Sequence, residues 1–125
     1  MPKIIPLCVN GQDSITEFLA ELIDKHPGQE SQYGRKLMKI LEEFESKGPL
    51  INKDHKNFIP FKKIKGERYD GIYEIRTKKC RFFIYKDDQN TFIGLHGFEK
   101  KSDKTPRNEL EKARNEVLLW IKTKN

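Results

Sequence analysis

Apolar residues recur at helical spacing in three segments of the chain, which predicts three amphipathic helices. The first spans residues 14–26 and opens with a Ser-x-x-Glu capping box at Ser14. The second contains residues 33–44 and stops at a Lys-Gly-Pro sequence. The third covers residues 105–121, with Thr105 as N-cap and a proline in the first helical position.

Between the second and third helices, apolar residues alternate over shorter distances, as is typical of strands. Three strands are predicted at residues 71–77, 80–86 and 91–98, with connectors short enough for hairpins. A short strand is predicted at residues 4–9, and residues 58–61 suit a sheet edge because a proline there cannot donate to a ladder.

The predicted order of elements is β-α-α-β-β-β-α. This order indicates an α+β fold with an antiparallel sheet, two N-terminal helices packed on one face and a C-terminal helix. A length of 125 residues suits a single domain, residues 1–125.

The lengths of the two hairpin connectors predict a register for the sheet. A two-residue turn at residues 78–79 places Arg76 opposite Arg81, and a turn centred on residues 88–89 places Arg81 opposite His96. Opposed residues point to the same face of a sheet, so the register predicts one row of two arginines and a histidine.

The same register collects apolar side chains on the opposite face of the sheet. We expect this face to pack against the two N-terminal helices, because a one-residue slip would scatter its members. They are Tyr73, Ile75, Phe82, Ile84, Ile93 and Leu95.

The positive charge of the chain is concentrated in one segment. The net charge is +6, and residues 61–107 hold 13 Lys/Arg against 7 Asp/Glu, while the rest is balanced. One interpretation is a solvated lysine-rich surface. The other is a face that binds phosphates, because clustered cations displace counterions from nucleic acid.

Like charges placed opposite one another destabilise a sheet, so the predicted row needs an explanation. Either a carboxylate such as Glu74 or Glu109 neutralises it, or the row surrounds an anion. In the second hypothesis Arg76 and Arg81 bind a phosphate, and His96 exchanges a proton near neutral pH. Lysines of the adjoining loops complete the candidate RNA-binding set: Lys78, Lys79, Lys100, Lys101 and Lys104.

Other kinds of site find little support in the sequence. Cys8 and Cys80 form no CxxC pair, and no spacing suits a metal, a P-loop or a dinucleotide fingerprint. We therefore expect free thiols, no metal and no cofactor. No apolar run approaches the roughly 20 residues of a membrane span, and the start is too short for a signal peptide, so a cytoplasmic protein without membrane association is expected.

Three segments together resemble the phage-derived HigB-type branch of the RelE/ParE toxin superfamily. They are DGIYEIR at 70–76, CRFFIY at 80–85 and LHGFEKKSDKTP at 95–106. The resemblance implies a RelE-like fold and the toxin of a type II toxin–antitoxin system. It also implies a helix-turn-helix antitoxin of the HigA kind as partner, with a toxin–antitoxin heterotetramer as one assembly, and mRNA on the ribosome as target.

If the chain is like the RNase members of that superfamily, the resemblance implies that it cleaves mRNA and inhibits translation. The residues favour metal-independent cleavage, in which the RNA 2′-hydroxyl attacks the adjacent phosphate and protein groups supply acid, base and charge stabilisation. The candidates are His96 as acid or base, with Arg81 and Arg76 on the phosphate. Two alternatives stay open: a ParE-like inhibitor of DNA gyrase, and a non-catalytic RNA-binding module.

Overall fold

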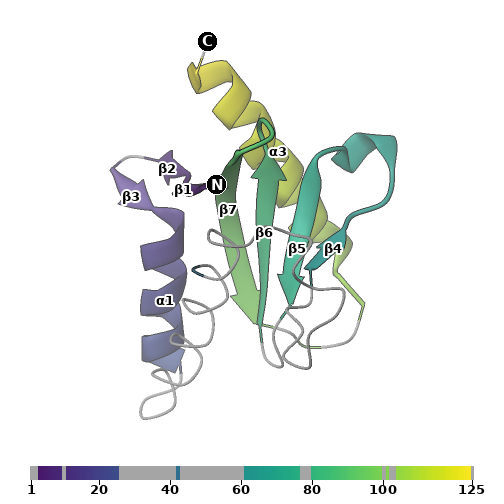
Figure 1. Cartoon of the computed structure of the whole chain (residues 1–125). Coiled ribbons are helices and arrows are strands. Elements are labelled where there is room, and N and C mark those ends of the chain that lie inside the picture. The colour runs from purple at the N-terminus through teal and green to yellow at the C-terminus, as the bar shows by residue number, and fades with distance from the viewer. Residues whose placement is uncertain are drawn as a thin grey trace.

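The computed structural model describes residues 3–9, 11–25, 42, 61–76, 80–99, 101 and 104–124 (Figure 1). In chain order the elements are β1 (Lys3–Pro6), β2 (Cys8–Val9), β3 (Gln12–Asp13), α1 (Ser14–Lys25), β4 (Phe61–Lys63), the 3-10 helix η2 (Glu67–Tyr69), β5 (Ile72–Arg76), β6 (Cys80–Lys86), β7 (Thr91–Glu99) and α3 (Arg107–Lys124). The turn at residues 78–79 lies outside the described residues, as does the predicted second helix apart from residue 42, which is helical. Within the described ranges, no helix is long and apolar enough to cross a membrane.

The main sheet is mixed, which corrects the prediction of an antiparallel sheet. Its strand order is β1-β7-β6-β5-β4, and β1 runs parallel to β7 while the other pairs are antiparallel. Strands β2 and β3 form a separate two-stranded hairpin. A parallel pair needs a long connection, and here residues 7–90 lie between β1 and β7. Local pattern therefore could not reveal this pairing.

Helices α1 and α3 lie on opposite faces of the sheet (Figure 1). On the α3 face, Phe83 of β6 and Leu95 of β7 are fully buried in one cluster with Ala113 of the helix. On the α1 face, Phe18 packs against Phe82 with ring centroids 6.0 Å apart. The two faces alternate along β6, where the neighbouring Phe82 and Phe83 point to opposite sides, as the pleat requires.

The predicted register is confirmed for the first hairpin and wrong for the second. Arg76 lies opposite Arg81, as expected. Arg81, however, lies opposite Phe98 and not opposite His96. The turn between β6 and β7 is one residue longer than predicted, and the pairing shifts again between Phe82 and Ile84. An extra residue at such a bulge changes which side chains share a face beyond it.

The shifted register moves two side chains to the other side of the sheet. Ile93 and Leu95 belong to the cluster under α3, so their predicted place against the N-terminal helices is wrong. The predicted apolar residues of β5 and β6 do share the α1 face, where Phe82 contacts Phe18.

The start of each described helix differs from the prediction. The Asp13 carboxylate caps α1 by accepting hydrogen bonds from the backbone N–H groups of Ile15 and Thr16, at 2.9 and 3.0 Å. The Ser14 hydroxyl donates instead to the Gly94 carbonyl at 2.8 Å and so ties α1 to β7. Helix α3 begins at Arg107, slightly later than expected.

Close contact between α1 and β7 makes Gly97 sensitive to substitution. A Cβ added there would lie 2.8 Å from Cγ of the buried Phe18 ring. We expect Gly97→Ala to lower the free energy of unfolding by about 1–3 kcal/mol, the usual cost of overpacking. In the double variant with Phe18→Leu, the cost of the added methyl should be smaller than in the single variant. Urea denaturation of the four proteins of this cycle measures the coupling, and strict additivity would contradict the contact.

An ion-pair cluster fastens η2 to α3. Nε of Arg68 donates to Glu111 Oε2 at 2.9 Å, and the Tyr69 hydroxyl donates to the same oxygen at 2.5 Å. The hydrogen bond from Arg68, followed by that from Tyr69, lowers the pKa of Glu111 from 4.5 to about 2. The charged form of Glu111 is therefore favoured by the folded state.

This lowered pKa predicts a pH-dependent contribution to stability. Because Glu111 binds its proton less readily when folded, its contribution is complete above pH 4.5 and is lost as the pH falls toward 2. We expect Glu111→Gln to be less stable than the native protein at pH 7, and the difference to shrink across this range. Denaturation curves at pH 7, 4 and 2.5 measure it, with Glu67→Gln as an exposed control. A difference that does not change with pH would contradict the assignment.

Candidate nucleic-acid interface

Glu74 of β5 contacts both arginines of the first hairpin, Arg76 and Arg81. Its side chain is fully buried, and Oε1 accepts a hydrogen bond from Nε of Arg76 at 2.5 Å. Nε of Arg81 lies 3.5 Å from the same oxygen, and the Thr105 hydroxyl donates to Oε2 at 2.7 Å. One buried carboxylate therefore joins β5 and β6 to the segment that precedes α3, and it neutralises part of the charge of the two arginines.

The two arginines differ in exposure. The Arg81 side chain is only 7% exposed, and its Nη1 donates to the Cys80 carbonyl at 3.0 Å. The Arg76 side chain is 29% exposed. Among the described residues, Glu74 is the one partner with which this side chain forms a hydrogen bond. Arg76 can therefore present its remaining N–H groups to an anion, whereas Arg81 is held inside.

A basic pocket with a volume of about 730 Å³ lies at the start of α3. The cations that line it are Arg68, Lys104 and Arg107. Arg68 forms an ion pair with Glu111. Lys104 and Arg107 are exposed. Thr105 lines this pocket and also bonds Glu74, so the pocket adjoins the cluster that holds Arg76. We call this region the basic pocket.

The predicted RNA-binding lysines do not gather at one place in the described structure. Lys104 lines the basic pocket, whereas Lys101 lines a different cavity on the α1 side of the β7 end. Lys78, Lys79 and Lys100 lie outside the described residues.

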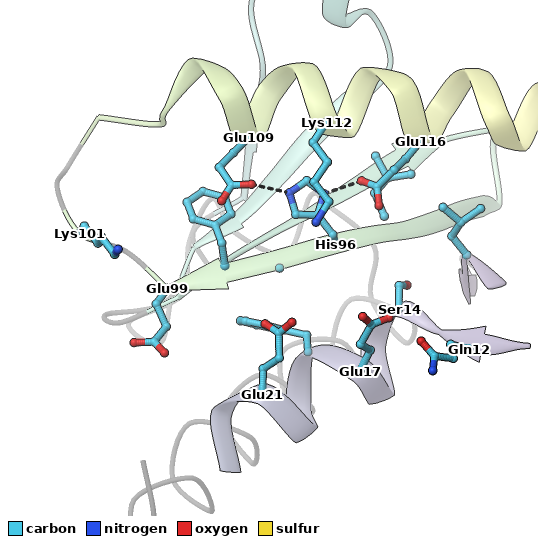
Figure 2. Close-up of a pocket in the computed structure, with 15 residues that line it drawn as sticks. Gln12, Ser14, Glu17, Glu21, His96, Glu99, Lys101, Glu109, Lys112 and Glu116 are labelled. Carbon is cyan, nitrogen blue, oxygen red and sulfur yellow. Dashed lines mark hydrogen bonds and ion pairs between the residues drawn. The ribbon is translucent and has the colours of Figure 1, made fainter. Parts of the chain in front are cut away.

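His96 is held between two carboxylates of α3. Its Nε2 lies 3.1 Å from Oε1 of Glu109, and its Nδ1 makes a short contact with Oε1 of Glu116 (Figure 2). Carboxylate oxygens at both ring nitrogens fix the orientation of the imidazole.

The surroundings of His96 are acidic, not basic as predicted. A cavity of about 410 Å³ runs along β7 between α1 and α3, and we call it the acidic groove. Figure 2 shows carboxylates from both helices directed into it. The titratable residues that line it are Glu17, Glu21, His96, Glu99, Lys101, Glu109, Lys112 and Glu116. A phosphate in this groove would meet repulsion.

The predicted row of Arg76, Arg81 and His96 is therefore not formed. Phe83 lies opposite Glu74 on one side and contacts the His96 ring on the other, with centroids 5.3 Å apart. The longer turn and the bulge put this aromatic side chain between the arginine cluster and the histidine. The catalytic roles proposed for these residues stay predictions.

Sequence reasoning missed three residues of these sites. Thr105 was interpreted as a helix cap, Arg107 was not singled out, and Glu116 was not considered. A signal for Glu116 was present, because Glu109 and Glu116 are seven residues apart and so lie on one face of a helix. Within the described ranges, no group of three His, Cys, Asp or Glu side chains is arranged to hold a metal ion.

One known protein family matches most of the chain. No curated protein matches the chain. The family model described as "Phage derived protein Gp49-like (DUF891)" matches residues 21–117, a range that includes β4 to β7, the basic pocket and His96. This family is one of RelE/HigB-like toxins, which agrees with the resemblance at that level. The matched range is well over half of the 125 residues, and the chain belongs to the Gp49-like family of phage-derived proteins.

Proposed function

We propose that the protein is the toxin of a type II toxin–antitoxin system and that it cleaves mRNA, on the ribosome, to inhibit translation. Membership of the Gp49-like family supports the toxin part of the proposal. The observation that carries the RNA part is Arg76, a partly exposed guanidinium fixed by a fully buried carboxylate beside a basic pocket.

The proposed reaction uses a nucleophile that RNA itself supplies. The 2′-hydroxyl attacks the adjacent phosphorus, the P–O2′ bond forms and the P–O5′ bond breaks. The products are a 2′,3′-cyclic phosphate and a 5′-hydroxyl, with one proton moving from the 2′-oxygen and one to the 5′-oxygen. No metal ion is required by this route.

Arg76 is suited to stabilise the charge that develops on the phosphate. Its Nε is held by Glu74, so its outer N–H groups are oriented without further ordering, and a guanidinium matches phosphate oxygens bidentately. We assign the binding of flanking phosphates to Lys104 and Arg107, which line the basic pocket. Arg81 is placed to hold Glu74 rather than to touch RNA.

His96 is proposed as the proton donor to the leaving oxygen, and its two contacts with Glu109 and Glu116 hold the ring in place. The donor role requires the leaving oxygen to reach the mouth of the acidic groove. Retained cleavage by a folded His96→Gln variant would remove His96 from the reaction and leave the proposal for Arg76 intact.

A single experiment separates cleavage from the two alternatives. Purified protein is added to translating ribosomes with a reporter mRNA, the new RNA 5′ ends are mapped and their chemistry is determined, and a gyrase supercoiling assay runs in parallel. We expect discrete cuts with 5′-hydroxyl and cyclic phosphate ends, and unaffected gyrase. Intact mRNA with inhibited gyrase would favour the gyrase inhibitor, and bound but uncut RNA would favour the binding module.

The proposal also requires a neutralising partner, because an active mRNA endonuclease stops growth. We propose a small helix-turn-helix antitoxin encoded beside this chain, in a complex that includes a heterotetramer among its forms. Co-expression should restore growth and yield a co-purifying pair. Normal growth on expression of this folded chain alone would contradict the toxin assignment.

A further inference from the structure

The outer edge of β7 is covered by β1 only along its first half. The pairing of β1 with β7 ends at Pro6 and Gly94, and the last backbone hydrogen bond runs from Leu7 N–H to the Gly94 carbonyl at 2.8 Å. From Leu95 to Glu99, β7 pairs with β6 on its inner side, and no described strand lies on its outer side. An unpaired strand edge is a template for a further strand.

This edge, which no described strand covers, forms the floor of the acidic groove. Leu95, Gly97 and Glu99 of β7 line the cavity, with α3 on one side and α1 on the other (Figure 2). At about 3.3 Å per residue, five residues of edge span roughly 16 Å, which is enough to pair with a short extended segment. The cavity volume of about 410 Å³ lies in the range of sites that bind ligands.

Two carboxylates of the groove are available to a partner. Glu109 and Glu116 are engaged by His96. Glu17 and Glu21 lie one helical turn apart on α1, are exposed, and point toward the groove (Figure 2). Neither makes an ion pair with any residue in the described part of the chain. They therefore favour a cation on the α1 side of the edge.

The charge of the groove selects among the possible occupants. A second copy of this chain would bring its own glutamates against Glu17 and Glu21, so edge-to-edge dimerisation is disfavoured. Nucleic acid is disfavoured for the same electrostatic reason. A positively charged peptide segment satisfies both the backbone edge and the carboxylates.

We propose that the groove binds an extended, Lys/Arg-bearing segment of a partner protein, which adds to β7 as a strand along Leu95–Glu99. Its side chains on one face meet Glu17 and Glu21, and those on the other face lie under α3. This interaction surface is separate from the basic pocket, and it does not depend on the proposed RNA cleavage.

The test uses a capped heptapeptide of alternating lysine and threonine as the probe. Binding is measured by calorimetry at low ionic strength, and hydrogen exchange of the β7 amides is followed by NMR. We expect saturable binding, slower exchange at residues 95–99, and at least a tenfold loss of affinity in the Glu17→Gln/Glu21→Gln double variant. Glu67→Gln/Asp70→Asn, which removes two exposed carboxylates outside the groove, should bind as the native protein does.

Backbone pairing is tested with two N-methylated forms of the peptide, one on every lysine amide and one on every threonine amide. Only alternate amides of an added strand face β7, so one form should bind like the parent and the other at least tenfold more weakly. Absence of binding at about 1 mM peptide overturns the proposal, as does equal binding by both double variants or by both methylated forms. Peptide binding is measured on the protein without RNA, so failure here is distinct from failure of the proposed function, which the mapping of cleaved mRNA ends tests separately.

Discussion

Glu74→Ala is expected to lower the free energy of unfolding by about 3–5 kcal/mol, the usual cost of removing one partner from a buried ion pair. The carboxylate is fully buried and is shared by Arg76, Arg81 and Thr105. Its loss removes a fully buried negative charge that lies 3.5 Å from Nε of the buried Arg81. Urea denaturation of the native protein and the variant measures the difference, with Glu67→Ala as the exposed control.

A second variant separates loss of the charge pair from loss of packing. Replacing both buried partners, as Glu74→Leu with Arg81→Met, removes the uncompensated charge while it keeps much of the volume. We expect this double variant to be clearly more stable than Glu74→Ala, since a buried pair gains little over apolar groups of similar shape. A loss below about 1 kcal/mol in Glu74→Ala would show that Glu74 does not hold this end of the sheet together.

Arg76→Ala is expected to reduce mRNA cleavage by at least about 100-fold while leaving the protein folded. The magnitude is that of losing one donor that stabilises the transition state. The side chain is partly exposed, so its removal should change the free energy of unfolding far less than the removal of Glu74. Cleavage rates under single-turnover conditions and a thermal melt are measured on the same samples.

The neighbouring arginine provides the matched control for Arg76. Arg81→Ala should lower stability, because that side chain is buried against Glu74. Arg76→Lys should restore only part of the activity, because an ammonium cannot bond Glu74 and present a planar pair of donors together. Near-normal cleavage by a folded Arg76→Ala protein would contradict the proposed phosphate site.

The sequence alone predicted the local elements well. The alternation in residues 71–98 placed β5, β6 and β7 to within a residue or two, and the helical periodicity placed α1 and α3. It also predicted that Arg76 lies opposite Arg81, because a two-residue turn leaves a hairpin one register. These features depend on residues close together in the chain.

Tertiary structure decided what those elements bring together. The bulge in β7 and the three-residue turn before it moved His96 away from Arg81 and toward Glu109 and Glu116 of α3. An inserted residue has a small local energetic cost and leaves the alternation of apolar residues recognisable in the sequence. Beyond it, however, each side chain of the strand points to the opposite face of the sheet. The electrostatic setting of His96 could therefore be seen only in the folded chain.

The pairing of β1 with β7 and the open edge beyond it were likewise decided by the fold. Strand propensity indicates that a segment is extended, but it does not say which distant strand it pairs with or where that pairing stops. The pairing stops at Pro6 and Gly94, after which the chain continues into the β2–β3 hairpin and α1. The sequence by itself determined the helices, the strands and the basic character of residues 61–107. Long-range packing decided that Arg76 and Arg81 lie around the buried carboxylate of Glu74 and that His96 lies in an acidic groove.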